Sequence, residues 1–496
     1  MSLTSQEYIT PAQFFQFLDQ FEEQDGPGEQ KQQKQEEGER LTRSGEVVHH
    51  PGPRKCSRIP PELWDEIIGH LSEDLQTLKA CSQASKQWLD RSRRHLFRSV
   101  ALPGLQNANP HRGLITFLAF LLADTDQRRH IQNLRIFTKD SETEDPLEDP
   151  RRASVCKHDL QEVLLQLPNL RKLTLSRIRF RGCRTQCAMR SLKAIPISLK
   201  ILTLEAGSWN DQIPNLFDIF SLFGDVDVLN ALAIRFEAHG SDTTDDLLLS
   251  PVSPAPEHLR IRTVITEREE NFYDEKVEGV FWKILQNSPS VRAVTGLRAY
   301  CGLGAAHPSL KQFMQNIKGT LVQLYLDLTG VLQDLEFDQE PIEWGWLALS
   351  SYPCMQSVAF ALTLTNDALF GTYIPEPDEI IGEMFGESIR LINILFTASR
   401  SKSIRHVTVE VSFVLYYERE PDIGTVLASR VDWQTFREVL GRLDNLETLT
   451  FVVGGRVIDV CRPVLERVWE DLHARGVLRL KGVASGYGPP RLQIEE

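Results

Sequence analysis

Apolar residues recur at helical spacing in the segment 59–100. Pro60 and Pro61 stand at its start, and proline favours a helix start because the first helical N–H groups have no intrahelical acceptor. The apolar residues that follow at four-residue steps place a continuous stripe along one face of that helix. They are Leu63, Ile67 and Leu71, with Ile68 beside them. The pattern predicts a helix whose apolar stripe needs a partner surface.

A second helical segment is expected directly after the first. Residues 72–74 read Ser-Glu-Asp, which is suitable chemistry for the cap and first turn of a helix. Leu75, Leu78, Ala84 and Trp88 then continue at helical spacing. We therefore expect this segment to end near Trp88, and the whole of 57–100 to be a small helical module.

The chain beyond position 100 alternates short strand-like runs with amphipathic helical stretches. The strand-like runs share an L-x-x-L-x-L pattern or its β-branched equivalent, and they are Asn133–Phe137, Leu170–Leu175, Leu199–Leu204, Val228–Ile234, Val291–Leu297, Leu321–Leu326, Met355–Phe360, Ile404–Val409 and Leu446–Phe451. The expected helices are Asp159–Leu167, Leu216–Phe223, Val280–Leu285, Leu310–Ile317, Ile389–Phe396 and Trp433–Leu443.

One strand and one helix per unit, repeated every 29 to 50 residues or so, is typical of a leucine-rich-repeat-like solenoid with degenerate repeats. A single unit cannot bury its own apolar face, whereas stacked neighbours share a continuous core and a parallel sheet. The alternative is a doubly wound α/β domain, but no Gly-rich turn of the dinucleotide-binding type follows a first strand. The expected fold class is therefore α/β (α+β overall), with an all-helical module followed by a solenoid.

Composition adds limits to this reading. The chain has 496 residues, a formal net charge of −13, 41% hydrophobic residues and 25% charged residues, as in ordinary globular proteins. The acidic balance argues against a nucleic-acid partner, because such proteins usually present a basic face. No apolar run reaches the ~18 residues needed to cross a bilayer, and the N-terminus lacks the order of a secretory signal. We expect an intracellular protein, cytoplasmic or nuclear, with no membrane partner.

The domain boundaries follow from these patterns. Residues 1–56 are expected to hold a short amphipathic helix over Ile9–Phe21 and then a disordered tether rich in Gln and Glu, which cannot offset its ordering entropy by burial. The helical module occupies 57–100, the repeat region 101–485, and a tail 486–496.

The helical module resembles an F-box. The family pattern of a Pro start, an apolar helix, a second Leu and a later Trp is matched by Ile59-Pro60, Leu63, Ile67-Ile68, Leu71, Leu78 and Trp88. The continuation from Arg91 to Phe97 resembles the F-box proteins abundant in mushroom-forming fungi. One departure is Ala84, where the family often has Val, and the smaller side chain buries less apolar area at a cost of about 1 kcal/mol. The resemblance covers about a tenth of the chain.

This resemblance implies a substrate-receptor subunit of an SCF-type cullin ubiquitin ligase. Its adaptor-binding residues would be Pro60, Leu63, Ile67, Ile68, Leu71, Leu78, Ala84 and Trp88, which contact the SCF adaptor subunit or support that contact, and the adaptor in turn hangs from a cullin. The repeat region would hold an unknown target protein. The alternative is a leucine-rich-repeat-like interaction scaffold unrelated to ubiquitin, in which the helical module only seals the first repeat.

Catalytic, cofactor and metal signatures are not found in the sequence. It has no G-x-S-x-G, H-E-x-x-H or G-x-x-x-x-G-K-[ST] motif, and it is therefore not expected to be an enzyme or to bind a cofactor. The eight cysteines lack C-x-x-C spacing. Only Cys183 and Cys187 lie close together. Cys156 and His158 upstream have the wrong composition and spacing for the second half of a zinc site, so reduced thiols are expected.

Overall fold

The computed structural model describes most of the chain from Pro60 to Val483. The described residues are 60–72, 74–104, 110–123, 125–138, 154–155, 157–180, 196–205, 208–210, 219–232, 235–237, 256–267, 275–301, 307–329, 347–365, 377–397, 402–414, 423–454 and 457–483. The expected helix at Ile9–Phe21, the tether and the tail lie outside these residues, as do the cysteines at 183 and 187.

The chain divides into two compact units. The first comprises residues 1–102, 111–134 and 159–170, and the second comprises 103–110, 135–158 and 171–496. The first unit therefore extends beyond position 100, where the sequence pattern had placed the end of the helical module. No helix among the described residues is long and apolar enough to cross a membrane.

The first unit is mainly helical. Its elements are α2 (Pro61–His70), α3 (Leu75–Ala84), α4 (Lys86–Leu96), most of β1 (Ser99–Gly104), α5 (Pro110–Ala123), the 3₁₀ turn η1 (Gln127–Arg129) and most of α6 (Lys157–Leu165). Phe97, just after α4, stacks on Phe120 of α5 with ring centroids 6.1 Å apart, and Phe120 in turn stacks on Phe117. These three buried rings join α4 to α5 inside one core.

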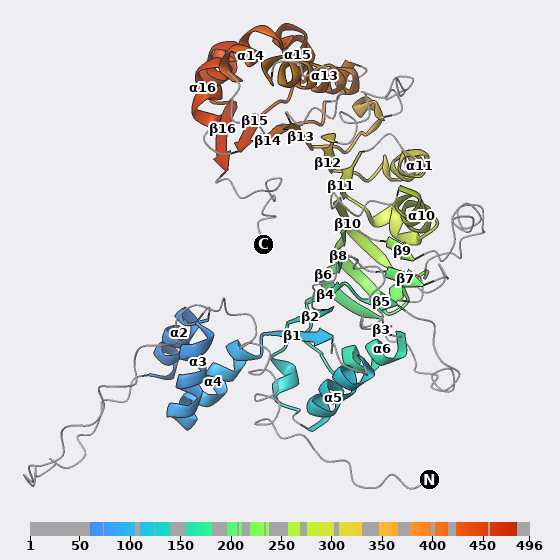
Figure 1. The fold of residues 1–496 in the computed structure, drawn as a ribbon, viewed down its shortest axis with the longest axis vertical. Coiled ribbons are helices and arrows are strands. Elements are labelled where there is room, and N and C mark those ends of the chain that lie inside the picture. The colour runs from blue at the N-terminus through green and yellow to red at the C-terminus, as the bar shows by residue number, and fades with distance from the viewer. Residues whose placement is uncertain are drawn as a thin grey trace, which may run out of the picture. The chain divides into compact units, whose positions relative to one another are not determined.

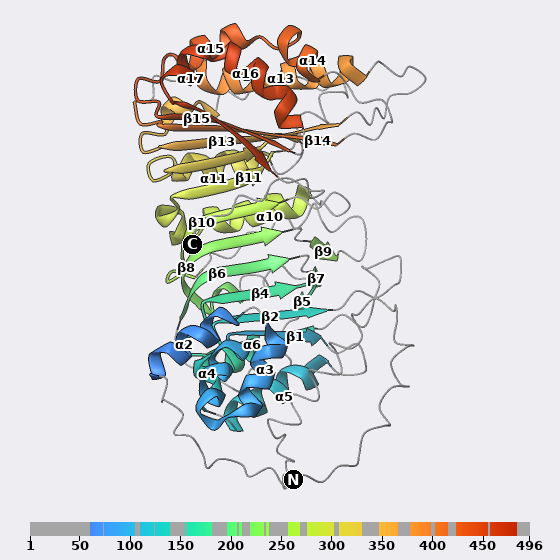
Figure 2. The same ribbon diagram turned by 90° about the vertical axis from the view of Figure 1, so that its left-hand side faces the viewer.

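Parallel strands run through the second unit in chain order. The main sheet in the described residues has the order β1-β2-β4-β6-β8-β10-β11-β12-β13-β14-β15-β16. Each pair from β4 to β16 is parallel, and Figure 2 shows these strands lying side by side. The strands are β2 (Asn133–Thr138), β4 (Lys172–Ser176), β6 (Ile197–Glu205), β8 (Phe223–Leu232), β10 (Arg260–Glu267), β11 (Gly296–Tyr300), β12 (Gln323–Asp327), β13 (Ser357–Thr365), β14 (His406–Val414), β15 (Thr448–Gly454) and β16 (Leu478–Val483).

Helices connect the later strands. They are α10 (Glu275–Gln286), α11 (His307–Ile317), α13 (Pro377–Thr397), α14 (Ile423–Ser429), α15 (Trp433–Leu440), α16 (Val457–Val468) and α17 (Glu470–Ala474), with the 3₁₀ turns η2 (Pro289–Ala293) and η5 (Leu349–Ser351). Figure 1 shows α10 and α11 on one side of strands β10 to β12. The described residues thus form a mixed α/β structure with twelve α-helices and a twelve-stranded sheet.

The alternation of side chains along each strand separates two faces of this sheet. On β13 the fully buried Phe360 packs its ring against Phe396 of α13, 5.9 Å away, so its face of the strand is directed at the helices. Ala359 and Ala361 occupy the opposite face, which carries mostly small and polar residues. The helix side of the sheet is therefore the apolar core.

Most of the expected strands are confirmed with shifted ends. The exception is Val291–Leu297, where only the end is strand, because Ser288 caps the short helix η2 and Pro289 opens it. The hydroxyl of Ser288 accepts from the Ser290 N–H at 3.2 Å. The expected helix at Leu216–Phe223 is described from residue 219 onward: residues 219 and 220 are helical, 221 and 222 form a turn, and Phe223 already begins β8. The other five expected helices are confirmed as α6, α10, α11, the second half of α13, and α15.

Several elements were not expected from the sequence. They include the main-sheet strands β10 and β16 and a second parallel sheet of short strands, β3 (Ser154–Val155), β5 (Arg179–Phe180), β7 (Ser208–Asn210) and β9 (Arg235–Glu237). Arg177 adopts a positive φ of 55° between β4 and β5, so the chain changes direction there and leaves the main sheet. Strands of two or three residues are too short for periodicity to reveal.

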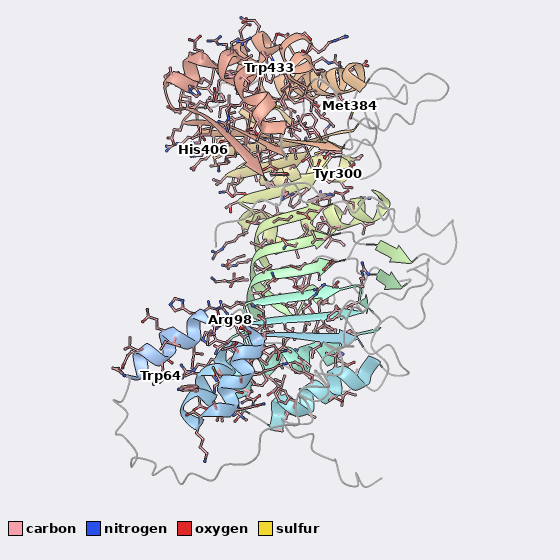
Figure 3. All side chains as sticks on the ribbon, turned by 60° about the vertical axis from the view of Figure 1, so that its left-hand side comes forward. Trp64, Arg98, Tyr300, Met384, His406 and Trp433 are labelled. Carbon is pink, nitrogen blue, oxygen red and sulfur yellow. The ribbon has the colours of Figure 1, made fainter. Side chains whose placement is uncertain are left out.

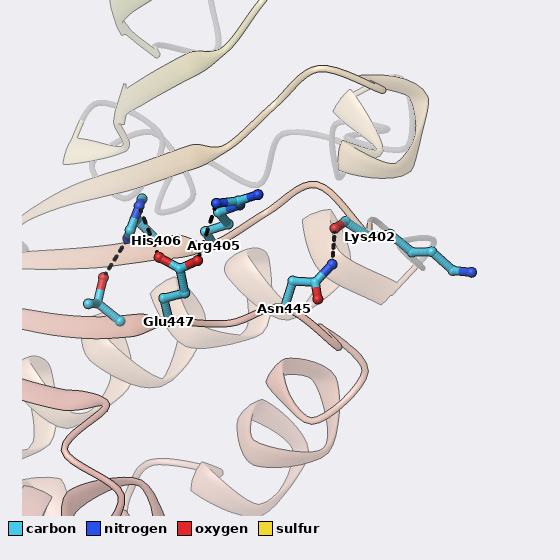
Figure 4. A network of polar contacts seen from close by, with 6 residues as sticks. Lys402, Arg405, His406, Asn445 and Glu447 are labelled. Carbon is cyan, nitrogen blue, oxygen red and sulfur yellow. Dashed lines mark hydrogen bonds and ion pairs between the residues drawn. The ribbon is translucent and has the colours of Figure 1, made fainter.

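Polar side chains join the starts of β14 and β15 (Figure 4). Arg405 and His406 both face the carboxylate of Glu447, with N–O distances of 3.3 Å and 3.9 Å. Nδ1 of His406 also lies 2.9 Å from the Thr448 hydroxyl, and the Asn445 amide donates to the Lys402 carbonyl at 2.6 Å. The ion pairs of Glu447 are exposed, so each contributes little to stability.

Candidate functional site

The first helix begins where the sequence predicted. Pro60 is the N-cap of α2, and its carbonyl accepts hydrogen bonds from the N–H groups of Leu63 and Trp64 at 3.1 Å and 3.4 Å. The helix ends at His70, and Leu71 closes it by donating its N–H to the Ile68 carbonyl at 3.0 Å. The two prolines thus start α2 without losing an intrahelical hydrogen bond.

Helix α2 has two apolar faces, one of which is buried and the other exposed. On the inner face Ile68 is buried, and Trp64 packs against Trp88 with ring centroids 4.8 Å apart. On the outer face Leu63 and Ile67 remain 48% and 44% exposed. The side chain of Trp64 on α2 is labelled in Figure 3. Ile67 and Ile68 are neighbours in sequence but point to different sides of the helix. The apolar stripe predicted from the sequence is therefore partly buried in the core and partly exposed at the surface.

The second helix ends earlier than the sequence suggested. Ser85 is extended, with φ −153° and ψ 136°, so α3 stops at Ala84 and a third helix, α4, begins at Lys86. The Ser85 carbonyl accepts the N–H groups of Trp88 and Leu89, both at 3.0 Å. The expectation of one segment ending near Trp88 was therefore wrong, because Ser85 turns the chain into a new helix on which Trp88 lies.

The eight residues expected to bind an adaptor fall into three groups by exposure. Ile68 and Leu78 are buried, so their side chains support the module from inside. Leu71 and Trp88 are half-buried. Pro60, Leu63, Ile67 and Ala84 are exposed. Ala84 is therefore not a packing residue of the module, and its small size costs the free chain no buried area.

Sequence reasoning did not assign Leu75 to the site. It is the first residue of α3 and is 46% exposed, four positions beyond Leu71. Leu75 continues the four-residue spacing of Leu63, Ile67 and Leu71, and this spacing could have identified it as a site residue. The polar cap residues 72–74 interrupt the apolar pattern before it. We call Leu63, Ile67 and Leu75 the outer apolar residues.

Charges flank these outer apolar residues. Asp65 of α2 pairs with Arg91 of α4, with Oδ1 and Nε 2.8 Å apart. Asp74 caps α3 by accepting the Thr77 N–H at 2.9 Å, and the hydrogen bonds from the side chain and backbone of Thr77 lower the pKa of its carboxyl. Burial, followed by the charge of Arg98, lowers the pKa of His95 near the end of α4. The His95 imidazole is thereby held toward its neutral form.

A second polar site crosses strands β10 to β14 on the face of the sheet that carries Ala359 and Ala361, opposite Phe360. The phenol of Tyr325 donates to Glu410 Oε2 at 2.7 Å, and the guanidinium of Arg298 lies over the Tyr325 ring at 4.3 Å from its centroid. Arg298 also pairs with Glu267, with N and O 3.4 Å apart. We call Glu267, Arg298, Tyr325 and Glu410 the cross-strand polar chain.

The sheet register explains how Tyr325 reaches Glu410. Tyr325 stands opposite Ala359 on β13, and Ala361 stands opposite Glu410 on β14. These two alanines leave room for the ring to lie over β13, and the three residues pack as one buried cluster. A larger side chain at either alanine would separate the phenol from the carboxylate.

Burial sets the protonation of this polar chain. Desolvation raises the pKa of Glu410, opposed by the hydrogen bond from Tyr325 and by the charge of Arg298. Burial, together with the Glu410 carboxylate, raises the pKa of Tyr325, so the phenol keeps its proton and remains a donor. The four groups satisfy one another, which is the arrangement of a structural network.

The described residues contain no group of three or more His, Cys, Asp or Glu side chains arranged to hold a metal ion. Among them Cys81, Cys301, Cys354 and Cys461 are free thiols. Burial raises the pKa of Cys461 to about 12 and that of Cys301 well above its usual range, so neither is an activated nucleophile.

No protein-family model matches the chain, and no curated protein matches it significantly.

Proposed function

We propose that this chain is the substrate-receptor subunit of an SCF-type cullin ubiquitin ligase. The observation that carries the proposal is the exposure of Leu63 and Ile67 on a helix whose other apolar side chains are packed. Adjacent large aliphatic side chains kept in water favour a protein partner over a purely structural role. They lie at the positions that the F-box resemblance assigns to adaptor contact.

The energetic contribution of this face is modest but adequate for a docking anchor. Full burial of a Leu or Ile side chain is worth about 1.5–3 kcal/mol, and the remaining half of each would contribute about 1 kcal/mol. The buried Ile68 and Leu78 hold α2 and α3 in place behind the outer apolar residues. In this proposal the outer apolar residues contact the adaptor, and the buried residues keep α2 and α3 in the position that this contact needs.

The second unit would act as the target-binding part. Its strands follow one another in chain order, which supports a leucine-rich-repeat-like solenoid over a doubly wound domain, whose strand order reverses at a switch point. In this proposal the target would contact the polar, half-buried side chains of the sheet face opposite Phe360, outside the buried group around Tyr325. Holding a target near the ubiquitin-charged enzyme raises the effective concentration of its lysines, and the receptor supplies no reacting group.

The alternative is an interaction scaffold unrelated to ubiquitin, in which α2 to α4 seal the end of the repeats. The stacking of Phe97 on Phe120 favours it, because this contact ties the module to α5 within one unit. In that case the outer apolar residues would have no adaptor to bind.

The test is a binding measurement between the full chain and a purified SCF adaptor. Leu63→Asp with Ile67→Asp should weaken binding at least tenfold, because two charges replace the contact side chains while the core of the module is untouched. Leu71 is a poorer choice because it is half-buried. The matched control is Ile115→Asp with Leu122→Asp, which changes two side chains on α5 that are each 57% exposed and should leave binding unchanged.

Two results would count against the proposal. Wild-type protein that does not bind the adaptor at micromolar concentration favours the scaffold. Equal weakening by both double variants would mean that the effect is not specific to α2, provided that far-UV circular dichroism shows each variant folded.

A further inference from the structure

Three basic side chains gather on the paired strands β4 and β6. Arg171 directly precedes β4, Lys172 opens it, Lys200 lies on β6, and all three are exposed. The Lys200 N–H donates to the Arg171 carbonyl at 2.8 Å, so these two residues are direct neighbours on adjacent strands. Like charges at neighbouring positions of a sheet repel each other. We call Arg171, Lys172 and Lys200 the basic patch.

The same position carries opposite charges elsewhere in the sheet. The Glu447 N–H donates to the Arg405 carbonyl at 2.8 Å before β14 and β15, and there the two side chains form an ion pair at 3.3 Å. The position is thus neutralised at β14 and β15, whereas Arg171 and Lys200 make it doubly positive at β4 and β6. A repulsive pair costs stability, which favours a binding role for it over a structural one.

The carboxylates of β8 are matched by arginines of β10. Figure 2 shows β4, β6, β8 and β10 side by side. The register places Asp227 opposite Lys200, and Asp227 is paired with Arg262, with O and N 3.2 Å apart. Asp225 stands opposite Arg260 on the same two strands. These described positions therefore hold five basic and two acidic residues, a balance of +3 in a chain of net charge −13: Arg171, Lys172, Lys200, Arg260 and Arg262 against Asp225 and Asp227.

An apolar surface adjoins the basic patch. Ile201 of β6 and Val228 of β8 stand opposite each other, and both are half-buried. Lys172 stands opposite Ile201 on its other side. The row continues through the register to Ser357 of β13, two positions before Ale359's strand neighbour row ends at the same face, which is the face opposite Phe360.

The chemistry of this face favours a peptide over a nucleic acid. The next row is polar, with the Asn230 amide donating to the Thr203 hydroxyl at 3.2 Å. Among the described residues, this face of β4, β6 and β8 carries no aromatic side chain on which a base could stack. The net charge of −13 also opposes binding to a long polyanion. A short acidic segment of a protein meets neither obstacle.

We propose that the basic patch, together with Ile201 and Val228, binds an extended acidic segment of a target protein. Carboxylates of that segment would pair with the basic patch, and an apolar side chain between them would lie on Ile201 and Val228. Alternate residues of an extended chain are about 7 Å apart and adjacent strands about 4.8 Å, so carboxylates on both sides of one apolar residue can reach cations on β4 and β6. This inference rests on the proposed target-binding role of the second unit.

The test is fluorescence anisotropy of the full chain with a labelled probe peptide, Gly-Glu-Glu-Ile-Glu-Glu-Gly, at low ionic strength. The wild-type chain should bind it at least tenfold more tightly than the same peptide with Gln in place of each Glu, and at least threefold more tightly than the peptide with Ser in place of Ile. Arg171→Glu with Lys200→Glu should weaken binding of the acidic probe at least tenfold, because attraction becomes repulsion.

The matched control is Arg479→Glu with Lys481→Glu. It reverses two exposed basic side chains on β16 of the same sheet and changes the net charge by the same amount. This control should weaken binding less than twofold. Circular dichroism checks that both double variants are folded.

Three outcomes would overturn the proposal. The first is no binding of the acidic probe by the wild-type chain at millimolar concentration. The second is equal weakening by the two double variants, which would reduce the effect to overall charge. The third is tighter binding of a five-nucleotide oligo(U) RNA, whose four phosphodiesters carry the same charge as the probe, because the surface would then prefer a nucleic acid.

Adaptor binding is measured separately on the same proteins. Arg171→Glu with Lys200→Glu should bind the adaptor like the wild type, and Leu63→Asp with Ile67→Asp should bind the probe like the wild type. Loss of one activity without the other therefore shows which of the two proposals has failed.

Discussion

Tyr325 connects the buried polar groups of the sheet. Its phenol donates to Glu410, and its ring supports the guanidinium of Arg298. A buried carboxylate is costly unless it is hydrogen-bonded, so the stability of Glu410 in this site depends on the phenol. Ala359 and Ala361 permit the contact by being small.

We expect Tyr325→Phe to destabilise the protein by about 1–3 kcal/mol, because Glu410 would lose its hydrogen-bond donor while remaining buried. Chemical denaturation measures the change. Tyr352→Phe is the matched control, since Tyr352 is also buried and burial, rather than a contact with a carboxylate, raises the pKa of its phenol. A loss of the same size in both variants would contradict the account of the network.

Helix starts are governed by a few cap residues at the scale of the element. Asp74 and Asp432 each accept the N–H and the hydroxyl of a Thr three positions later, at the starts of α3 and α15. The sequence signal was visible at Asp74, where it helped to locate the second helix. No such signal marked Ser85 as the end of α3. A single Ser within an apolar pattern does not by itself predict extended backbone, which here depends on how α3 and α4 pack.

Asp432→Ala should destabilise the protein by about 1 kcal/mol at pH 7, whereas Asp432→Asn, which still caps, should cost less. The hydrogen bonds from Thr435 lower the pKa of Asp432. A carboxyl with a lowered pKa stabilises the folded state above its usual pKa of 3.8, and this contribution is lost as the pH falls through the folded-state value. The advantage of Asp over Asn should therefore shrink between pH 5 and pH 2 in thermal unfolding. An advantage that grew on acidification would contradict this prediction.

At the scale of the whole molecule, the order of the strands determines how far the destabilisation caused by a local substitution extends. In the described sheet each strand pairs only with its neighbours in the chain order, so a local defect has no direct route to distant strands. The first unit, by contrast, combines the helical module with residues 111–134 and 159–170, which come later in the chain. The sequence pattern divided the chain at position 100 because helical and repeat patterns meet there.

Phe360→Ala should cost about 3–5 kcal/mol, because it removes a fully buried ring in contact with Phe396. Hydrogen exchange should accelerate in β12, β13 and β14 and remain unchanged in β4 and β6. Uniform acceleration across the sheet would show that it unfolds as one cooperative body rather than locally.

The sequence by itself determined the helix start at Pro60, most of the parallel strands and the apolar stripe of α2, because these depend on local periodicity and on proline geometry. Tertiary structure alone decided which half of that stripe is core and which is surface. Ile67 and Ile68 are adjacent and similar in chemistry, yet one is exposed and the other is buried. The difference arises from the position of α4, whose Trp88 packs on Trp64 and closes one side of α2 only. The cross-strand polar chain also required the folded register, since Glu410 and Tyr325 lie 85 residues apart in sequence.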